Sequence, residues 1–460
     1  MRDSYNSSAL RLDHGGRSVG PALDLNELSR KCAEGGCSDI LPSLIPLPIC
    51  ALVTAVVCTD FMLAAEGRSS WDRLLARLDA SAGNRDRCHI IDNSKFLLQA
   101  MVVAGHLFPP SIHVQIMAGP YPWLVFLPNY MRSFHVPMYA FLSGLVTRGP
   151  LTRDKVRRLT QGVLIPYLIL NMFVLDLRTS SGLLSEPQVP TPWDPTHLWY
   201  LPALLGWHAL ASLLECCFSR VGILVASYVI SWVSGYWCFL NQHDYMVNQM
   251  LALFCFFGTG YCIPVACVRL LEQRMVRYCG LVVTCFFLLL HFSLAKVTPL
   301  HVATEAESLR AVPSYSLWAF WNTQVTRHPY FVPQVQLVQA IDPYIYYTVW
   351  MQRLAVQFLV TWPCGLAFLA VVPHSETFFT ELGKHSMYSY VFHRVVIDSH
   401  YMAPMYALVR QKEHLHYAMA ALSLAAGLAT LMCSRLTRCF TSWIVEPTWM
   451  EHLWTAPRLK

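Results

Sequence analysis

Apolar segments of about 20 residues recur along this chain from Ile90 onward. A segment of that length can cross the hydrocarbon core of a bilayer as a helix, because a helix satisfies its own backbone hydrogen bonds there. The expected segments are 91–108, 132–147, 158–178, 197–216, 221–240, 246–268, 279–297, 345–372, 386–407 and 415–434. We therefore predict an all-α fold, a multi-pass transmembrane helical bundle of about ten core helices.

The composition excludes several other classes of protein. Apolar residues make up 55% of the 460 residues, and charged residues make up only 13%. A soluble globular domain carries about 25% charged residues. The sequence is therefore not typical of a water-soluble enzyme, a disordered regulator or a nucleic-acid binder.

Three parts are expected along the chain. Residues 1–85 form a polar extension with a basic linker and one apolar segment, 44–65, which is either an extra span or an anchor. Residues 86–434 form the membrane domain, and residues 435–460 form a cytoplasmic tail. The long connection 298–344 is rich in aromatic residues and prolines and is expected to form a cap.

Basic residues in short loops predict the orientation. Loops 148–158 and 269–277, the linker 66–90 and the tail after residue 434 are all rich in Arg or Lys. Counting the predicted spans places all four on the same side of the membrane. The positive-inside rule makes that side cytoplasmic, which places 298–344 outside or in a lumen and leaves open which membrane is meant.

The first core span carries a polar stripe on an apolar helix. In IIDNSKFLLQAMVVAGHLF, the side chains of Asp92, Lys95, Gln99 and His106 fall within about 60° of one another. Lys95 and His106 are eleven residues apart, which corresponds to about 16 Å along a helix. Ionisable residues within a span face a cavity or the protein interior, so these four are candidate site residues. The alternative is that Asp92 merely pairs with Lys95 and that His106 is an interior hydrogen-bonding group.

Later segments add further polar candidates. His135 is the second residue of FHVPMYAFLSG, whose Gly144 permits close helix contact. The segment HLWYLPALL opens with three aromatic or basic ring residues, which suit either a substrate path or an interfacial aromatic belt: His197, Trp199 and Tyr200. His385 and His393 are eight residues apart, and no metal-ligand pattern accompanies them, so no metal is expected.

A cluster of cations precedes the third span. Arg153, Lys155, Arg157 and Arg158 lie within six residues. Arg and Lys suit phosphate oxygens, so the cluster is a candidate phosphate dock, and the alternative is positive-inside charge alone. The 16 cysteines are scattered and are interpreted as small apolar filler, with a Cys32–Cys37 disulfide left open.

Five stretches in order resemble the membrane-bound acyltransferase-3 family, in the branch similar to fucose 4-O-acetylase. They are IDNSKFLLQAMVVAGH, FHVPMYAFLSG, KVRRLTQGVLIPYLILN, HLWYLPALL and LGKHSMYSYVFH. The resemblance implies transfer of an acyl group, usually acetyl, from cytoplasmic acyl-CoA to a hydroxyl of a carbohydrate-type acceptor. It also implies that His106 is catalytic, with a basic residue eleven positions earlier. Many family members have Arg there, whereas this chain has Lys95, which lacks the guanidinium fork.

The sequence thus predicts an integral-membrane O-acyltransferase that uses acetyl-CoA as donor and a carbohydrate or glycolipid as acceptor, without metal or nucleic acid. His106 and Lys95 are the expected catalytic residues, and Arg153, Lys155, Arg157 and Arg158 are expected to hold the CoA phosphates. The residues expected to contact substrate are Asp92, Gln99, His135, His197, Trp199, Tyr200 and His393. A secondary transporter of a small polar or anionic solute is the main alternative, because polar stripes also line transport paths. A receptor or sensor without catalysis is a third class.

Overall fold

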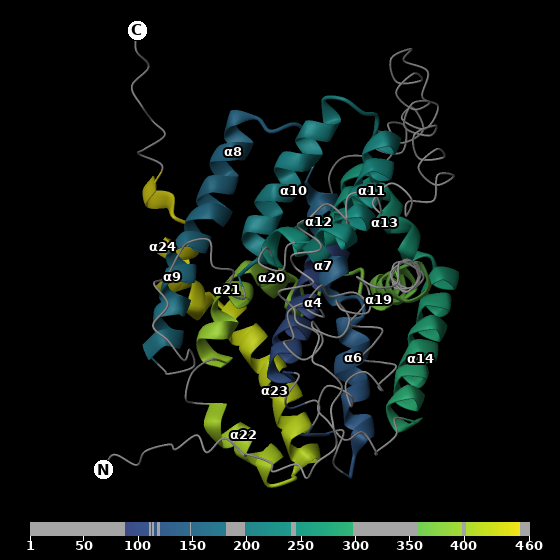
Figure 1. Cartoon of the computed structure of the whole chain (residues 1–460), viewed down its shortest axis with the longest axis vertical. Coiled ribbons are helices and arrows are strands. Elements are labelled where there is room, and N and C mark those ends of the chain that lie inside the picture. Colours follow the sequence, from purple (N-terminus) through teal and green to yellow (C-terminus); the bar gives the residue numbers. More distant parts are fainter. Residues whose placement is uncertain are drawn as a thin grey trace, which may run out of the picture. The chain divides into compact units, whose positions relative to one another are not determined.

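A computed structural model describes residues 88–109, 112, 115–116, 120–147, 149–180, 198–240, 245–297, 357–397 and 402–450. These ranges all belong to one compact unit, Leu52–Lys460. They are 86% helical and contain no strand, so the all-α prediction is confirmed for them (Figure 1). Segment 44–65, most of linker 66–90, connection 298–344, the Cys32–Cys37 pair and His197 lie outside the described residues.

Helices follow one another closely along the described ranges. The first eight are α4 (His89–Leu107), α6 (Phe126–Arg132), α7 (His135–Val146), α8 (Arg153–Leu159), α9 (Ile165–Ser180), α10 (Tyr200–Glu215), α11 (Arg220–Leu240) and α12 (Tyr245–Cys262). The next eight are α13 (Val265–Arg269), α14 (Arg274–Val297), α19 (Trp362–Val371), α20 (Phe378–Lys384), α21 (Ser386–Ile397), α22 (Ala403–Arg410), α23 (His414–Cys433) and α24 (Arg435–Val445). A π-helical turn, Thr160–Leu164, joins α8 to α9.

Two helices in the described ranges are long and apolar enough to cross a membrane, Arg274–Ser293 and His414–Cys433. A third candidate is the pair Gln249–Cys262 and Val265–Glu272, which is bent by 91° between its halves. Ten spans are therefore not established. The predicted 132–147 segment corresponds to α7, a helix of 12 residues, and the predicted tail 435–460 begins with the helix α24.

Apolar side chains point outward along the first of these two helices, within α14. Met275 is 72% exposed, Val282 is 68% exposed and Leu289 is 65% exposed. A large exposed apolar surface is rare on a water-soluble monomer, whereas lipid-facing helices need no polar coat. The outward face of α14 therefore has the character expected of a helix in contact with lipid.

Glycines permit the close contact between α7 and α12. A Cβ atom at Gly144 would lie 2.0 Å from the carbonyl oxygen of Phe257, and one at Gly260 would lie 2.0 Å from the carbonyl oxygen of Phe141. Only hydrogen atoms fit between the two backbones, which is the manner in which small residues pack helices tightly in membranes. The close contact predicted at Gly144 is confirmed.

Replacing Gly144 with Ala should lower the stability of the protein by about 1–3 kcal/mol, because the methyl group would overlap the backbone of α12. Gly427 on α23 is the matched control, since a Cβ atom there meets nothing within 4 Å. Gly427→Ala should raise stability by about 0.5–1 kcal/mol through the lower conformational entropy of alanine in the unfolded chain. Thermal midpoints of the purified proteins in detergent measure both effects, and equal midpoints would contradict the tight contact.

Candidate functional site

Two histidines that are distant in the sequence meet between α4 and α21. The ring centroids of His106 and His393 are 5.1 Å apart, and the ring planes are inclined by 30°. Gly383 of α20 packs on the carbonyl of Asp92 near the start of α4. The start of α4 therefore contacts α20, and its end contacts α21. His106 is half-buried and His393 is fully buried.

The hydrogen bond of His393 fixes its neutral tautomer. Its Nδ1 lies 3.0 Å from the carbonyl oxygen of Ser389. A carbonyl oxygen only accepts, so Nδ1 carries the hydrogen and the neutral ring has its lone pair at Nε2. Within the described part of the chain, this buried Nε2 has no hydrogen-bond partner. A buried ring nitrogen of this kind is suited to accept a proton or a hydrogen bond from a ligand.

His135 and Arg132 lie beside the residue that precedes His106. A Cβ atom at Gly105 would be 3.9 Å from His135 Nε2 and 4.0 Å from Arg132 Nε. The Nδ1 of His135 donates to the carbonyl oxygen of Met131 at 2.8 Å, which again leaves Nε2 as the lone pair of the neutral ring. Three imidazoles, two of them with this tautomer, therefore gather at the last turns of α4.

Arg132 holds the end of the helix that carries His106. Its Nη2 donates to the carbonyl oxygen of Gly105 at 2.7 Å and also to that of Phe108. Carbonyls in the last turn of a helix lack intrahelical partners, and a cation there also favours the helix dipole. The sequence prediction did not include Arg132. The sequence feature that could have identified Arg132 is its position as a cation within an apolar stretch, because such a cation normally has a function or a charged or polar partner.

Tyrosines connect the histidine pair to α7 and α10. The rings of Tyr390 and His393 are 6.1 Å apart, and those of Tyr200 and Tyr390 are 5.8 Å apart. The backbone N–H of Tyr200 donates to Tyr390 Oη at 3.1 Å, and its hydroxyl is 2.9 Å from Ser143 Oγ. Trp199 stacks edge-on against Tyr200 with centroids 5.8 Å apart. The predicted aromatic residues thus connect to the histidines through Tyr390, which the sequence did not single out.

The stripe predicted on α4 is mostly enclosed by protein. Asp92 and Gln99 are buried, and Lys95 is half-buried. Neither polar atom of the Gln99 side chain has a hydrogen-bond partner within the described ranges, and the same is true of Ser94 Oγ. Buried polar groups without a partner are few in native proteins, so these groups are candidate contacts for water or a ligand.

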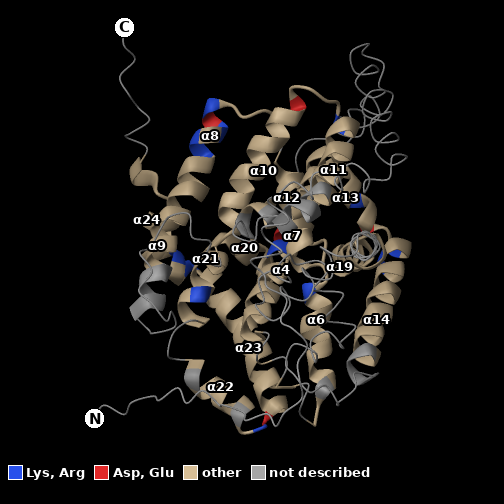
Figure 2. Ribbon diagram, in the orientation of Figure 1, with Lys and Arg blue, Asp and Glu red and all other residues tan. Residues whose placement is uncertain are grey.

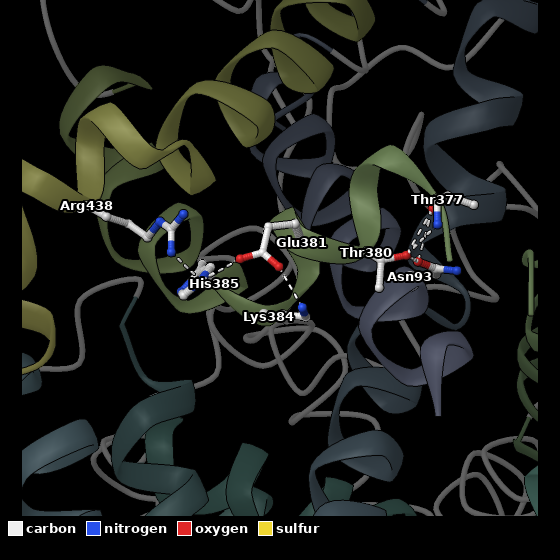
Figure 3. A network of polar contacts seen from close by, with 7 residues as sticks. All are labelled: Asn93, Thr377, Thr380, Glu381, Lys384, His385 and Arg438. Carbon is white, nitrogen blue, oxygen red and sulfur yellow. Dashed lines mark hydrogen bonds and ion pairs between the residues drawn. The ribbon is translucent and has the colours of Figure 1, made fainter. Parts of the chain in front are cut away.

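Asn93 fixes the start of α4 to the segment before α21. Its Nδ2 donates to the carbonyl oxygens of Pro373 at 2.7 Å and Ser375 at 3.0 Å. Its Oδ1 accepts from the hydroxyls of Thr380 at 2.6 Å and Thr377 at 3.2 Å. Figure 3 shows this cluster at one end of α20. Four hydrogen bonds on one fully buried amide therefore fix the helix of His106 relative to the segment that leads into the helix of His393.

The four predicted phosphate ligands lie together on α8. Thr152 caps this helix by accepting from the backbone N–H of Lys155 at 3.3 Å, and Lys155 Nζ donates to the carbonyl oxygen of Gly149 at 2.6 Å. Arg153 and Arg158 lie on the same short helix. Burial lowers the pKa of Lys155, and the charge of Arg158 adds to this, against an opposing effect of Glu215. Figure 2 shows this basic helix apart from α4 and α21, so the structure does not bring these cations to the histidines.

No group of three or more His, Cys, Asp or Glu side chains in the described ranges could hold a metal ion. The arrangement instead offers neutral imidazole nitrogens, hydroxyls and the Gln99 amide in a mostly buried setting. Such groups can accept or pass on a proton and can orient a polar substrate. Comparisons with models of protein families, with curated proteins and with solved structures give no significant match to this chain.

Proposed function

We propose that this protein is an integral-membrane O-acyltransferase that moves an acyl group, with acetyl expected, from acyl-CoA to a hydroxyl of a carbohydrate or glycolipid. The observation that carries the proposal is the contact of His106 with His393, with His135 beside the neighbouring Gly105. These three histidines were selected from separate stretches of the sequence, and they lie close together at the last turns of α4. The resemblance to the acyltransferase-3 family supports acyl transfer as the reaction at these histidines.

The reaction requires one base and one departing thiol. As the acceptor hydroxyl oxygen attacks the thioester carbonyl carbon, neutral His106 takes the hydroxyl proton. The carbon–sulfur bond then breaks, and the imidazolium returns its proton to the departing thiolate of CoA. His393 would stabilise the charged His106 through its unpaired Nε2 or would hold the acceptor hydroxyl. Lys95, on the same face of α4, would add positive charge near the donor.

The cations of α8 would receive the phosphates of the donor. CoA is polyanionic, and guanidinium groups bind phosphate oxygens in pairs. Because α8 lies apart from the histidines, the pantetheine arm would have to extend between the two places. The loops rich in Arg and Lys are proposed to be cytoplasmic, so the donor would enter from the cytoplasm and the acceptor from the opposite side.

Neutralising both Arg157 and Arg158 with Gln should raise the KM for acetyl-CoA about tenfold, because one lost charge-assisted hydrogen bond corresponds to about 1.5–3 kcal/mol. The kcat should change little, since these side chains do not contact the reacting atoms. Arg274→Gln with Arg277→Gln is the matched control, because this pair lies in the first turn of α14, within the basic segment 269–277 that is also proposed to be cytoplasmic. Steady-state kinetics measures both, and an equal effect of the two pairs would support positive-inside charge alone.

The test of the function is the fate of labelled acetyl groups. Membranes that contain the protein are supplied with acetyl-CoA labelled in the acetyl group, together with a carbohydrate extract as acceptor. Transfer predicts label in the carbohydrate fraction, with one free CoA thiol released for each acetyl group moved. Absence of both products with every acceptor fraction would contradict the proposal.

A secondary transporter is the second candidate function. Ser94, Gln99 and Ser389 are buried polar side chains with no hydrogen-bond partner for their side-chain oxygens in the described ranges, and α12 and α13 are bent sharply against each other. Polar groups and broken helices also occur on transport paths. Uptake of unmodified solute by sealed vesicles, without release of CoA thiol, would favour this function.

A further inference from the structure

One face of helix α24 carries exposed apolar side chains, while Val445 at its last position is buried in the core. Leu436 is 62% exposed, Phe440 is 71% exposed and Trp443 is 59% exposed. These positions are four and three residues apart, so they share one face of the helix, together with the exposed Cys439. A contiguous outward apolar face marks a surface that binds either another protein or a membrane.

The polar side of α24 faces the protein. Arg438 donates through Nη1 to Nε2 of His385, at the junction of α20 and α21, as Figure 3 shows. Thr437 Oγ1 donates to the carbonyl oxygen of Leu431 at 2.7 Å, and Thr441 Oγ1 donates to that of Thr437 at 2.7 Å. Burial, followed by the charge of Arg438, lowers the pKa of His385, which favours the neutral ring that accepts this hydrogen bond. The Thr441 hydrogen bond lies within α24, so the contacts that fix its orientation are those of Arg438 with His385 and of Thr437 with Leu431.

The position of α24 in the chain indicates what covers its outer face. Ser434 alone separates it from α23, a helix long and apolar enough to cross a membrane. Helix α24 therefore begins where that candidate span ends. Its 11 residues measure about 16 Å, which is too short to cross a hydrocarbon core of about 30 Å.

The chemistry of the outer face suits the boundary between lipid headgroups and acyl chains. Trp443 and, just beyond the helix, Trp449 are exposed aromatic residues of the kind that concentrate at this boundary. Arg435 is exposed at the start of the helix, and one acid, Glu446, is exposed at its end. We propose that α24 is an interfacial helix whose face of Leu436, Cys439, Phe440 and Trp443 lies in the leaflet at the end of α23, with Arg435 available to anionic headgroups.

The first test measures whether lipid touches Trp443. The full chain is placed, one molecule per disc, in lipid nanodiscs of phosphatidylcholine and phosphatidylglycerol, with or without bromine atoms on the upper part of the acyl chains. The fluorescence of Trp443 is the difference between the unchanged protein and Trp443→Phe. Bromination should reduce this difference to about half or less, because an interfacial side chain lies within contact of the upper acyl chain. The matched control is the fully buried Trp207, for which Trp207→Phe should give a difference signal that bromine leaves unchanged.

The second test uses the native cysteines as probes. Cys439 is exposed on the proposed lipid face, and Cys217 is exposed in the turn after α10. In the same nanodiscs, a water-soluble maleimide should modify Cys439 about tenfold more slowly than Cys217, since hydrocarbon excludes the reagent. Mass spectrometry of the two peptides gives both rates. Equal rates would overturn the proposal. Slow modification of Cys439 without bromine quenching of Trp443 would also overturn it, because another part of the same chain, and not lipid, would then cover the face.

Discussion

Replacing His106 with Ala should lower kcat/KM for acetyl transfer by about 10²–10⁴-fold, the range expected for loss of a general base. The half-buried imidazole of His106 contacts His393 and follows Gly105, which lies beside His135, so no other base on α4 is placed to replace it in the same position. His106→Gln should lose as much, because an amide fills similar space but takes no proton at neutral pH. Single-turnover assays with labelled acetyl-CoA measure the rates.

Variants of His393 test whether His106 and His393 act together in catalysis or independently of each other. If the two rings act together, His393→Ala should lower kcat, and the double variant should lose little more than His106→Ala alone, because coupled residues are not additive. The exposed His416 provides a control: His416→Ala, which removes a surface imidazole 3.4 Å from Glu413, should leave kcat unchanged. Additive losses at His106 and His393 would contradict a joint role. Full activity of His106→Ala would exclude acyl transfer at this site.

Replacing Asn93 with Ala should lower the stability by about 2–4 kcal/mol, because it removes four hydrogen bonds and leaves buried groups unsatisfied. The affected groups are the carbonyl oxygens of Pro373 and Ser375 and the hydroxyls of Thr377 and Thr380. The same change should reduce acyl transfer, since this amide fixes α4 relative to the segment that leads into α21. Thermal midpoints in detergent, together with transfer rates below the midpoint, measure the two effects.

Ser94 is the matched control for Asn93. It is the next residue and equally buried, but its hydroxyl has no partner in the described ranges. Ser94→Ala should therefore be neutral or slightly stabilising, because a buried hydroxyl without a partner costs free energy in the folded state. A midpoint for Asn93→Ala as high as that for Ser94→Ala would show that the Asn93 hydrogen bonds do not hold these segments together.

Local patterns in the sequence were sufficient to predict the helical fold and one close contact between helices. The apolar segments predicted helices, and the described residues contain helices and no strand. The small side chain of Gly144 predicted close helix contact, and its position would overlap a neighbouring backbone if a Cβ were present. The stripe on α4 marked His106. The helix and glycine predictions succeeded because the helical period relates neighbours within a few residues, and that period is visible in one dimension; the role of His106 stays a prediction.

The number of membrane spans could not be predicted from the sequence as well as the helical fold. Length and mean apolarity do not distinguish a helix that crosses a bilayer from a shorter helix buried against other helices. The 132–147 segment contains a helix of only 12 residues, and the chain bends between α12 and α13, because turns interrupt apolar runs without changing their composition. Two or three candidate spans are present in the described ranges, and the prediction of ten remains untested beyond them.

The sequence by itself determined that the described part of the chain is helical and apolar and that His106 lies on a polar face of its helix. Only the tertiary structure decided that His393 is the partner of that ring, that Arg132 holds the end of α4, and that the basic helix α8 lies apart from both. It also decided that the apolar face of α24 points outward. The reason is that a helical period fixes angles within one helix, whereas contacts between residues hundreds of positions apart depend on how whole helices pack.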